Sequence, residues 1–201
     1  MRMKSYQKQK SLILSFYENL ESANSRNVSD IIAKFTKPDF QWYGVYPFNE
    51  QFGGHAVAEA FWVPFLSNWS KVQRRQDIFL AGTSEIDNTD WVISMGHFVG
   101  LLDGNWLGFP SSRKLTFLRY ADFNCVRDGR IVRSGFFCDL IGFMHQIGIK
   151  PLPPEKGASL IYPGPRTHDG LLIESQDQLE SKKTLDLVNR MICDLVNLNK
   201  N

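Results

Sequence analysis

The 201-residue sequence has few cysteines, and those it has show no paired arrangement. Cys125, Cys138 and Cys193 are odd in number and lack the close spacing of a cysteine zinc site. An odd and widely spaced set argues against the disulfide framework that small secreted proteins carry. We therefore interpret the three residues as core thiols and expect a cytoplasmic protein.

Concentrated charge and long apolar runs are also missing. The formal net charge is only +2 and the basic residues are scattered, so we predict no nucleic-acid partner. No run approaches the ~20 apolar residues that span a bilayer. Near the N-terminus, Ser15, Glu18 and Asn19 interrupt the apolar positions before a secretory core can form. We therefore predict no membrane association.

The composition is that of a folded domain, with 43% hydrophobic and 22% charged residues. The length allows one domain of the usual ~100–200 residues together with an appendage. We assign residues 1–150 to the domain. Residues 151–174 are rich in proline and glycine and predict a linker or arm, and residues 175–201 predict an amphipathic helix.

Periodicity predicts the elements of the domain. Apolar stripes indicate helices over residues 5–23 and 28–35, and a third helical region, kinked at Pro64, over residues 56–69. A brief strand is expected at residues 40–43, and longer strands over residues 72–81, 91–100, 114–123 and 130–139. Short turns join the long strands, so the sheet should be mostly antiparallel. This order favours an α+β fold with helices on one face of a bent sheet.

The C-terminal helix has a candidate capping box at Ser175 and Gln178. Its apolar stripe consists of Leu185, Val188, Met191, Ile192 and Leu195. A lone amphipathic helix must bury such a stripe against the domain, a second subunit or a further piece of chain. Its pattern parallels residues 11–25, so it is alternatively the beginning of a second, similar domain.

Three of the long strands each carry one ionisable residue on their apolar face. Side chains alternate across a strand, so His97, Arg119 and Asp139 converge if the three apolar faces point the same way. A carboxyl group in an apolar pocket loses solvation, which raises its pKa and suits it to proton transfer near neutral pH. The alternatives are structural: a hydrogen-bonded core histidine, an arginine–carboxylate pair, and a helix N-cap at Asp139.

Aromatic residues near these strands are candidate walls of a substrate pocket, with core packing as the alternative for each tryptophan. The candidates are Trp42, Trp62, Trp91, Trp106, Phe117 and Phe137. His55, His145 and His168 share no ligand spacing, so we predict no metal site.

Four segments carry a family likeness: Gly96-His97-Phe98-Val99-Gly100, Trp106-Leu107-Gly108-Phe109-Pro110, Asp128-Gly129-Arg130-Ile131-Val132 and the ending Asp139 to Gly148. Together they resemble the SnoaL-like polyketide cyclase (ester cyclase) family of the nuclear transport factor 2-like (NTF2-like) superfamily. Upstream, Gly53-Gly54 and Phe61-Trp62-Val63-Pro64-Phe65 extend the likeness, which covers about residues 10–150.

The resemblance implies a cone-shaped α+β fold in which a curved antiparallel sheet wraps around N-terminal helices and encloses a deep cavity. It also implies a homodimer through the sheet. Cyclases of the family close a ring by an intramolecular aldol reaction without metal or cofactor, and their acid–base aspartate matches Asp139 here. His97 matches a histidine commonly found at the cavity. Many relatives have an aromatic and an acidic residue before the aspartate, where this chain has Gly135-Phe136.

These observations lead to a functional hypothesis. The chain is predicted to be a cofactor-independent acid–base enzyme, of cyclase, isomerase or hydrolase type, acting on a small hydrophobic carbonyl compound. Asp139 would transfer the proton, while His97 and Arg119 would stabilise the enolate oxygen. The alternative is a non-catalytic ligand-binding or assembly module, since fold does not fix function.

Overall fold

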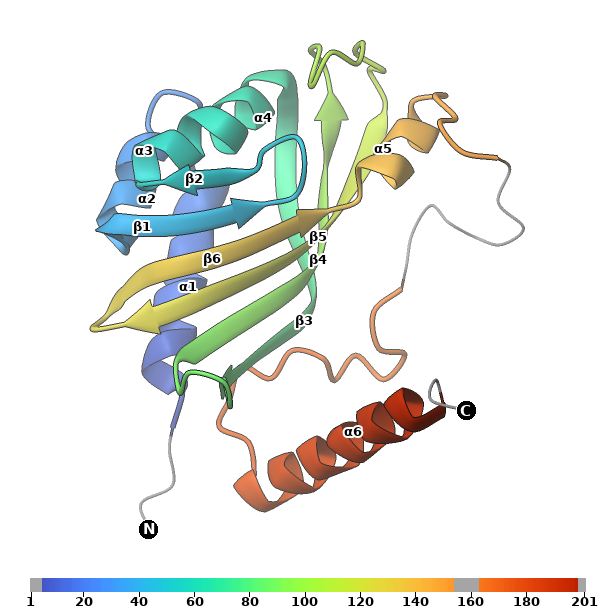
Figure 1. Ribbon diagram of the computed structural model, residues 1–201. Coiled ribbons are helices and arrows are strands. Elements are labelled where there is room, and N and C mark those ends of the chain that lie inside the picture. The colour runs from blue at the N-terminus through green and yellow to red at the C-terminus, as the bar shows by residue number, and fades with distance from the viewer. Residues whose placement is uncertain (1–4, 154–162, 199–201) are drawn as a thin grey trace.

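The computed structural model describes residues 5–153 and 163–198 (Figure 1). Its first half contains α1 (Gln7–Glu21), α2 (Val28–Phe35), β1 (Thr36–Gly44), β2 (Glu50–Phe52), α3 (Gly54–Val57), the π-helical turn η1 (Ala58–Trp62) and α4 (Val63–Asn68). The second half contains β3 (Trp69–Thr83), β4 (Asp90–Leu102), β5 (Leu115–Arg127), β6 (Arg130–Cys138), α5 (Leu140–Gln146) and α6 (Gln178–Leu198).

One six-stranded sheet in the order β2-β1-β6-β5-β4-β3 organises the domain. The predicted α+β class is confirmed, but the sheet is mixed rather than antiparallel, because β1 pairs with β6 in parallel. The other pairings are antiparallel. The strand predicted at residues 40–43 extends from Thr36 to Gly44, and its pairing with β6 is irregular around Pro38, which has no N–H to donate.

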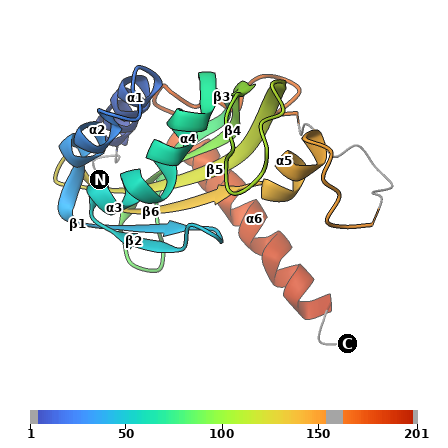
Figure 2. The same ribbon diagram turned by 90° about the horizontal axis from the view of Figure 1, so that it is seen from above.

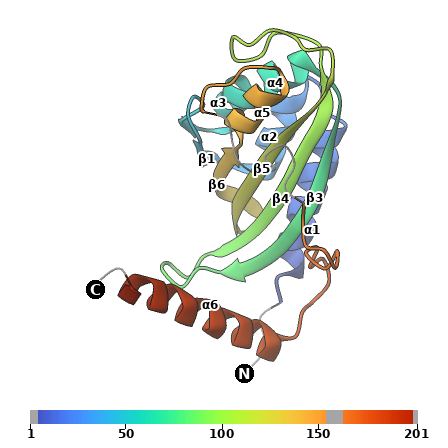
Figure 3. The same cartoon turned by 90° about the vertical axis from the view of Figure 1, so that its right-hand side faces the viewer.

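The sheet has two unlike faces. Helices α1–α4 cover one, called the inner face, and the sheet curves around them, as Figures 2 and 3 show. In β4 and β5 the even-numbered residues are buried on the inner face, among them Val92, Phe98 and Tyr120. Odd-numbered residues such as Trp91 and Ile93 therefore lie on the opposite, outer face.

Aromatic side chains fill much of the space between the inner face and the helices. Trp106, in the loop between β4 and β5, is completely buried, and its ring centre lies 5.6 Å from Phe65, 5.7 Å from Trp69 and 5.2 Å from Phe143. Phe61 extends the same cluster, since its ring lies 6.3 Å from that of Trp106. This part of the space between the helices and the inner face is therefore packed with aromatic rings.

The arm residues that the structure describes run along the β3 edge of the sheet. The Phe79 amide donates to the Gly170 carbonyl and the Leu172 amide to the Phe79 carbonyl, each over 2.8 Å. Lys10 of α1 holds the same segment, because its Nζ donates to the carbonyls of Leu172 at 2.6 Å and Glu174 at 2.9 Å. The edge strand is thus covered by the chain's own arm.

Helix α6 begins later than the capping box predicts. Asp177, not Ser175, supplies the cap, since its Oδ1 accepts from the Leu179 amide at 2.7 Å. The apolar side chains of α6 are exposed, and the helix projects away from the domain on the side opposite α1–α4 (Figures 2 and 3). Within residues 5–153 and 163–198, no helix is long and apolar enough to cross a membrane.

Candidate functional site

The three predicted catalytic residues lie close together, but on the outer side of the sheet. His97 of β4 faces Arg119 of β5 directly in the strand register. The Asp139 amide donates to the Arg119 carbonyl over 3.0 Å, so Asp139 lies next to Arg119, on the side away from His97. The prediction that His97 and Arg119 share a face is confirmed. Their expected position inside the cone is wrong, because the helices cover the even-numbered face instead.

His97 is buried and lies beside Asp77, whose Oδ2 is 3.3 Å from the histidine Nδ1. Burial lowers the pKa of His97; the Arg119 charge lowers it further, whereas Asp77 and Asp139 raise it. The net effect favours the neutral imidazole. His97 is thus a candidate hydrogen-bonding group in its neutral form rather than a positively charged group.

Asp139 caps α5, as the structural alternative predicted. Its Oδ1 accepts from the Gly142 amide over 2.8 Å. Asp139 also lines an apolar cavity of about 540 Å³ at the end of the sheet, together with Val45, Tyr46, Pro47, Leu107, Phe109, Cys138, Leu140, Ile141 and Met144. His97 and Arg119 do not line this cavity.

The predicted aromatic walls are divided between the two faces. Trp42 and Trp62 are buried on the inner side, and Trp106 is enclosed in the aromatic cluster. Trp91 and Phe137 line a hollow on the outer face. Phe117 also lies on the outer face, with its ring edge-on to His97 at 6.3 Å. The six residues therefore do not surround one pocket.

The inner face contains a polar network that the sequence reasoning missed. The Tyr17 hydroxyl of α1 donates to Asp122 Oδ2 over 2.8 Å, and Asn124 Nδ2 donates to the Tyr17 hydroxyl over 3.1 Å. Ser134 donates to Asn124 Oδ1 over 2.7 Å. Each of these side chains is buried, so the network joins α1, β5 and β6 within the core.

Arg74 of β3 enters the same region, with its side chain only 3% exposed. Its guanidinium lies 3.9 Å from the centre of the Tyr17 ring, 4.6 Å from that of Phe98 and 4.7 Å from that of Tyr120. Its Nη1 lies 3.8 Å from Asp122 Oδ2, beyond hydrogen-bonding distance. Neither Nη1 nor Nη2 has a hydrogen-bond partner among the described residues.

Burial controls the protonation of this network. It raises the pKa of Asp122, although the Arg74 charge and the hydrogen bond from Tyr17 act in the opposite direction. Burial likewise raises the pKa of Tyr17 well above its ordinary value, and the neighbouring Asp122 raises it further. The pKa of Asp122 therefore lies closer to neutral pH than that of an exposed aspartate, as proton transfer near neutral pH requires.

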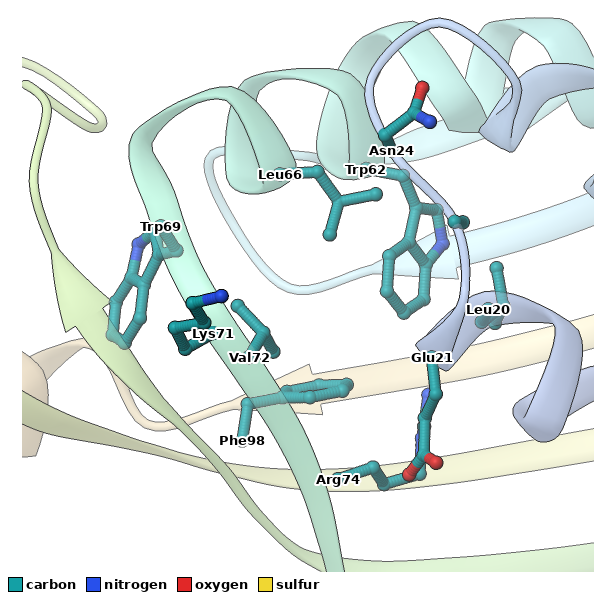
Figure 4. Close-up of a pocket in the computed structure, with 11 residues that line it drawn as sticks. Leu20, Glu21, Asn24, Trp62, Leu66, Trp69, Lys71, Val72, Arg74 and Phe98 are labelled. Carbon is teal, nitrogen blue, oxygen red and sulfur yellow. The ribbon is translucent and has the colours of Figure 1, made fainter.

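A cavity of about 200 Å³ lies beside Arg74, between α1, α4 and β3. We call it the Arg74 cavity; Figure 4 shows its lining, and the residues are Leu20, Glu21, Ala23, Asn24, Trp62, Leu66, Trp69, Lys71, Val72, Arg74 and Phe98. The indole nitrogen of Trp69 is also buried without a hydrogen-bond partner in the described part of the chain. The cavity thus combines apolar walls with unused donors on Arg74 and Trp69.

One signal in the sequence pointed to this network. Tyr120, Asp122 and Asn124 alternate along β5, and Ser94 of β4 belongs to the same face. A row of polar residues on one strand face is also typical of a solvated surface. Arg74 is separated from Asp122 by 48 positions, and only the sheet order brings them together. No group of three or more metal-ligating side chains occurs among the described residues.

Comparison with known proteins places the fold. No protein-family model and no curated protein matches the sequence. A proposed SnoaL-like polyketide cyclase from Jannaschia sp. CCS1 superposes with a TM-score of 0.55 at 17% identity, covering 77% of this chain and 100% of its own. IdmH, a proposed polyketide cyclase from Streptomyces antibioticus, superposes with a TM-score of 0.57 at 14% identity, covering 69% of this chain and 97% of its own.

AclR, a proposed hydroxylase from Streptomyces galilaeus, superposes with a TM-score of 0.57 at 18% identity, covering 74% of this chain and 100% of its own. The chain therefore has the cone-shaped α+β fold of SnoaL-like, NTF2-like proteins, and this part of the prediction is confirmed. At such identities the likeness concerns the fold alone.

Proposed function

We propose that this chain binds a compact molecule carrying a carbonyl or carboxylate oxygen in the Arg74 cavity. The observation behind the proposal is the set of buried donors, on Arg74 and Trp69, that lack a hydrogen-bond partner among the described residues. A buried donor without a partner is costly, so an acceptor oxygen placed there would be bound favourably. The volume of about 200 Å³ is below the ~300–1,000 Å³ of sites for drug-sized ligands, which favours a small molecule.

We further propose that the site performs cofactor-independent proton transfer. Arg74 would hold the carbonyl oxygen and stabilise the negative charge of an enolate, while Asp122 would remove the neighbouring proton. Trp62 lines the Arg74 cavity and also a void of about 20 Å³ that Asp122 lines, so it separates the two residues' cavities. Movement of the Trp62 ring would open Asp122 to the bound molecule.

Catalysis at Asp139 is a second candidate. It is favoured by the apolar cavity of about 540 Å³ that Asp139 lines, which is large enough for a hydrophobic compound. His97 and Arg119 lie beside Asp139 in the strand register and would act from the neighbouring strands.

Binding is tested by titrating the tryptophan fluorescence of the protein with benzoate and with acetophenone. Saturable binding in the wild type and at least about tenfold weaker binding in Arg74→Lys and Trp69→Phe are expected, because a lost charge-assisted hydrogen bond costs ~1.5–3 kcal/mol. Trp106→Phe is the matched control, since its indole nitrogen is also buried and unpartnered in the described residues but lies outside the Arg74 cavity. Equal binding by all variants would exclude the Arg74 cavity as the site.

Proton transfer is tested by following hydrogen–deuterium exchange at the methyl group of acetophenone in D₂O by NMR. The wild type should accelerate the exchange and Asp122→Asn should abolish the acceleration, whereas Asp139→Asn should not affect it. Loss of exchange in Asp139→Asn alone would assign the chemistry to the second candidate site. Binding without any exchange would support the non-catalytic binding module. The homodimer and the cytoplasmic location expected from the sequence remain proposals as well.

A further inference from the structure

Two charged side chains at the mouth of the Arg74 cavity have no ion-pair partner in the described part of the sequence. Lys71 of β3 and Glu21, the last residue of α1, are exposed and both line the cavity (Figure 4). Neither side chain forms an ion pair with the other or with any further described residue. The mouth therefore presents one positive and one negative group to a bound molecule.

Lys71 reaches the cavity because β3 contains a β-bulge. The register with β4 shifts between Ser70 and Gln73, so Lys71 and Val72 together oppose the single residue Gly100. A Cβ atom on Gly100 would lie 3.0 Å from the Ser70 carbonyl oxygen and 3.2 Å from Val72 Cγ2, so the bulge fits closely over a glycine. Both bulge residues line the Arg74 cavity. The bulge thus adds a lysine to the inner side of an edge strand.

Both mouth residues go against local structural preferences. The φ angle of Lys71 is 54°, in the left-handed region that favours glycine over any residue with a side chain. Glu21 places a carboxylate at the C-terminal end of α1, where the helix dipole is itself negative. Two locally unfavourable residues that meet at one cavity indicate a role in binding rather than in stability.

We propose that the ligand of the Arg74 cavity is a small α-amino acid with an acidic side chain. Its side-chain carboxylate accepts from the unused Nη1 and Nη2 donors of Arg74, its α-carboxylate pairs with Lys71, and its α-ammonium pairs with Glu21. This proposal rests on the binding function proposed above and adds the chemical class of the ligand.

The charges and the size of the cavity support this class. Glu21, Lys71 and Arg74 are the charged residues of the lining, and an acidic amino acid matches each of them with an opposite charge. A dicarboxylate without an ammonium would bring a like charge to Glu21, and a monocarboxylate would leave both mouth residues unmatched. The volume of about 200 Å³ suits a compact ligand, whose methylene groups would contact the apolar walls.

The experiment is isothermal titration calorimetry of the full chain with related compounds at ~0.15 M salt, where charges more than ~8 Å apart are largely screened. L-Glutamate carries all three charged groups, glutarate lacks the ammonium, γ-aminobutyrate lacks the α-carboxylate, and butyrate lacks both. Wild type should bind glutamate most tightly and butyrate most weakly.

Substitutions at the mouth should change the affinities in a selective pattern. Lys71→Met should weaken glutamate and glutarate by at least about threefold and should not weaken γ-aminobutyrate or butyrate. Glu21→Gln should weaken glutamate and γ-aminobutyrate by a similar factor and should not weaken glutarate or butyrate. Lys114→Met and Glu18→Gln, at exposed positions outside the cavity, are the matched controls and should bind all the compounds as wild type does.

Lys71→Gly separates binding from folding. Glycine adopts the left-handed conformation without strain, so this variant should keep or raise the melting temperature while it weakens glutamate and glutarate as Lys71→Met does. Unchanged binding in Lys71→Gly would mean that the lysine has no part in the site, and the proposal would be wrong.

The remaining outcomes distinguish this proposal from the binding function on which it rests. If wild type binds none of the compounds, or if Arg74→Lys binds them all as wild type does, the Arg74 cavity is not the site and both proposals fail. If Arg74→Lys weakens butyrate but wild type binds all the compounds equally, or binds glutarate most tightly, only the amino-acid class is overturned.

Discussion

Arg74 and Asp122 form a buried ion pair in which only the carboxylate is satisfied by hydrogen bonds. Their closest atoms, Nη1 and Oδ2, are 3.8 Å apart, and the side chains are 3% and 9% exposed. Tyr17 donates to Asp122, whereas Nη1 and Nη2 of Arg74 have no hydrogen-bond partner among the described residues. The guanidinium is therefore the member of the pair with bonding capacity left for a ligand.

The energetic coupling of this pair can be measured with a double-mutant cycle. Arg74→Met and Asp122→Leu should each destabilise the fold by about 3–5 kcal/mol, because each leaves a charge buried without its partner. The double variant should lose less than the sum, with a coupling of roughly 0.5–3 kcal/mol. Urea unfolding gives the three free energies. Additive losses would mean that the two charges do not interact.

The pKa of Asp122 predicts a pH dependence of stability. Burial raises this pKa, so the folded state binds the proton more tightly than the unfolded state, whose aspartate titrates near pH ~3.9. Stability from this group is therefore fully present at pH values below ~3.9 and is lost as the pH rises through the folded-state pKa. The asparagine in Asp122→Asn does not titrate, so this variant does not lose that stability. Its free energy of unfolding should therefore increase relative to that of wild type as the pH increases from about 4 towards neutral.

Urea unfolding of both proteins across this range checks the prediction. Asp128, whose pKa is lowered by its hydrogen bond from Lys37, has the opposite pH dependence in both proteins and cancels in the difference. The prediction fails if the difference in free energy of unfolding between the two proteins stays constant with pH, or if it shifts in favour of wild type as the pH rises. Either result would show that Asp122 does not titrate as its burial requires.

Asp139 should contribute to stability mainly as a helix cap. Asp139→Ala is expected to cost about 0.5–2 kcal/mol, because the Gly142 amide loses its acceptor. Asp139→Asn and Asp139→Ser keep a capping oxygen and should cost less. Thermal unfolding of the three variants measures the series. If Asn is as damaging as Ala, the negative charge of Asp139 matters beyond the cap.

Lys10 should hold the arm against the β3 edge. In Lys10→Met the carbonyls of Leu172 and Glu174 lose their charged donor, so the Leu172 amide should exchange with solvent about tenfold to hundredfold faster, as for the loss of ~1.5–3 kcal/mol. Hydrogen exchange measured by NMR resolves this amide. Lys8→Met, at an exposed position of the same helix, is the control. Unchanged exchange at Leu172 would show that β3 alone holds the arm.

Single helices and strands of this protein could be predicted because apolar spacing and helix-breaking residues act over only a few neighbouring positions. The helix over residues 28–35 has the predicted bounds, since its apolar spacing and the following Pro38 act over a few residues. The parallel β1–β6 pair could not be predicted, because the two strands are separated by most of the domain and nothing near either strand specifies its partner.

The sequence by itself determined the α+β class, the long strands and which residues share a face within each strand, since alternation along a strand is fixed by backbone geometry. Only the tertiary structure decided which face the helices cover, because the outer face is also apolar and both choices satisfy the same alternation. That choice buried Asp122 with Arg74 inside the cone and left His97, Trp91 and Phe137 outside it.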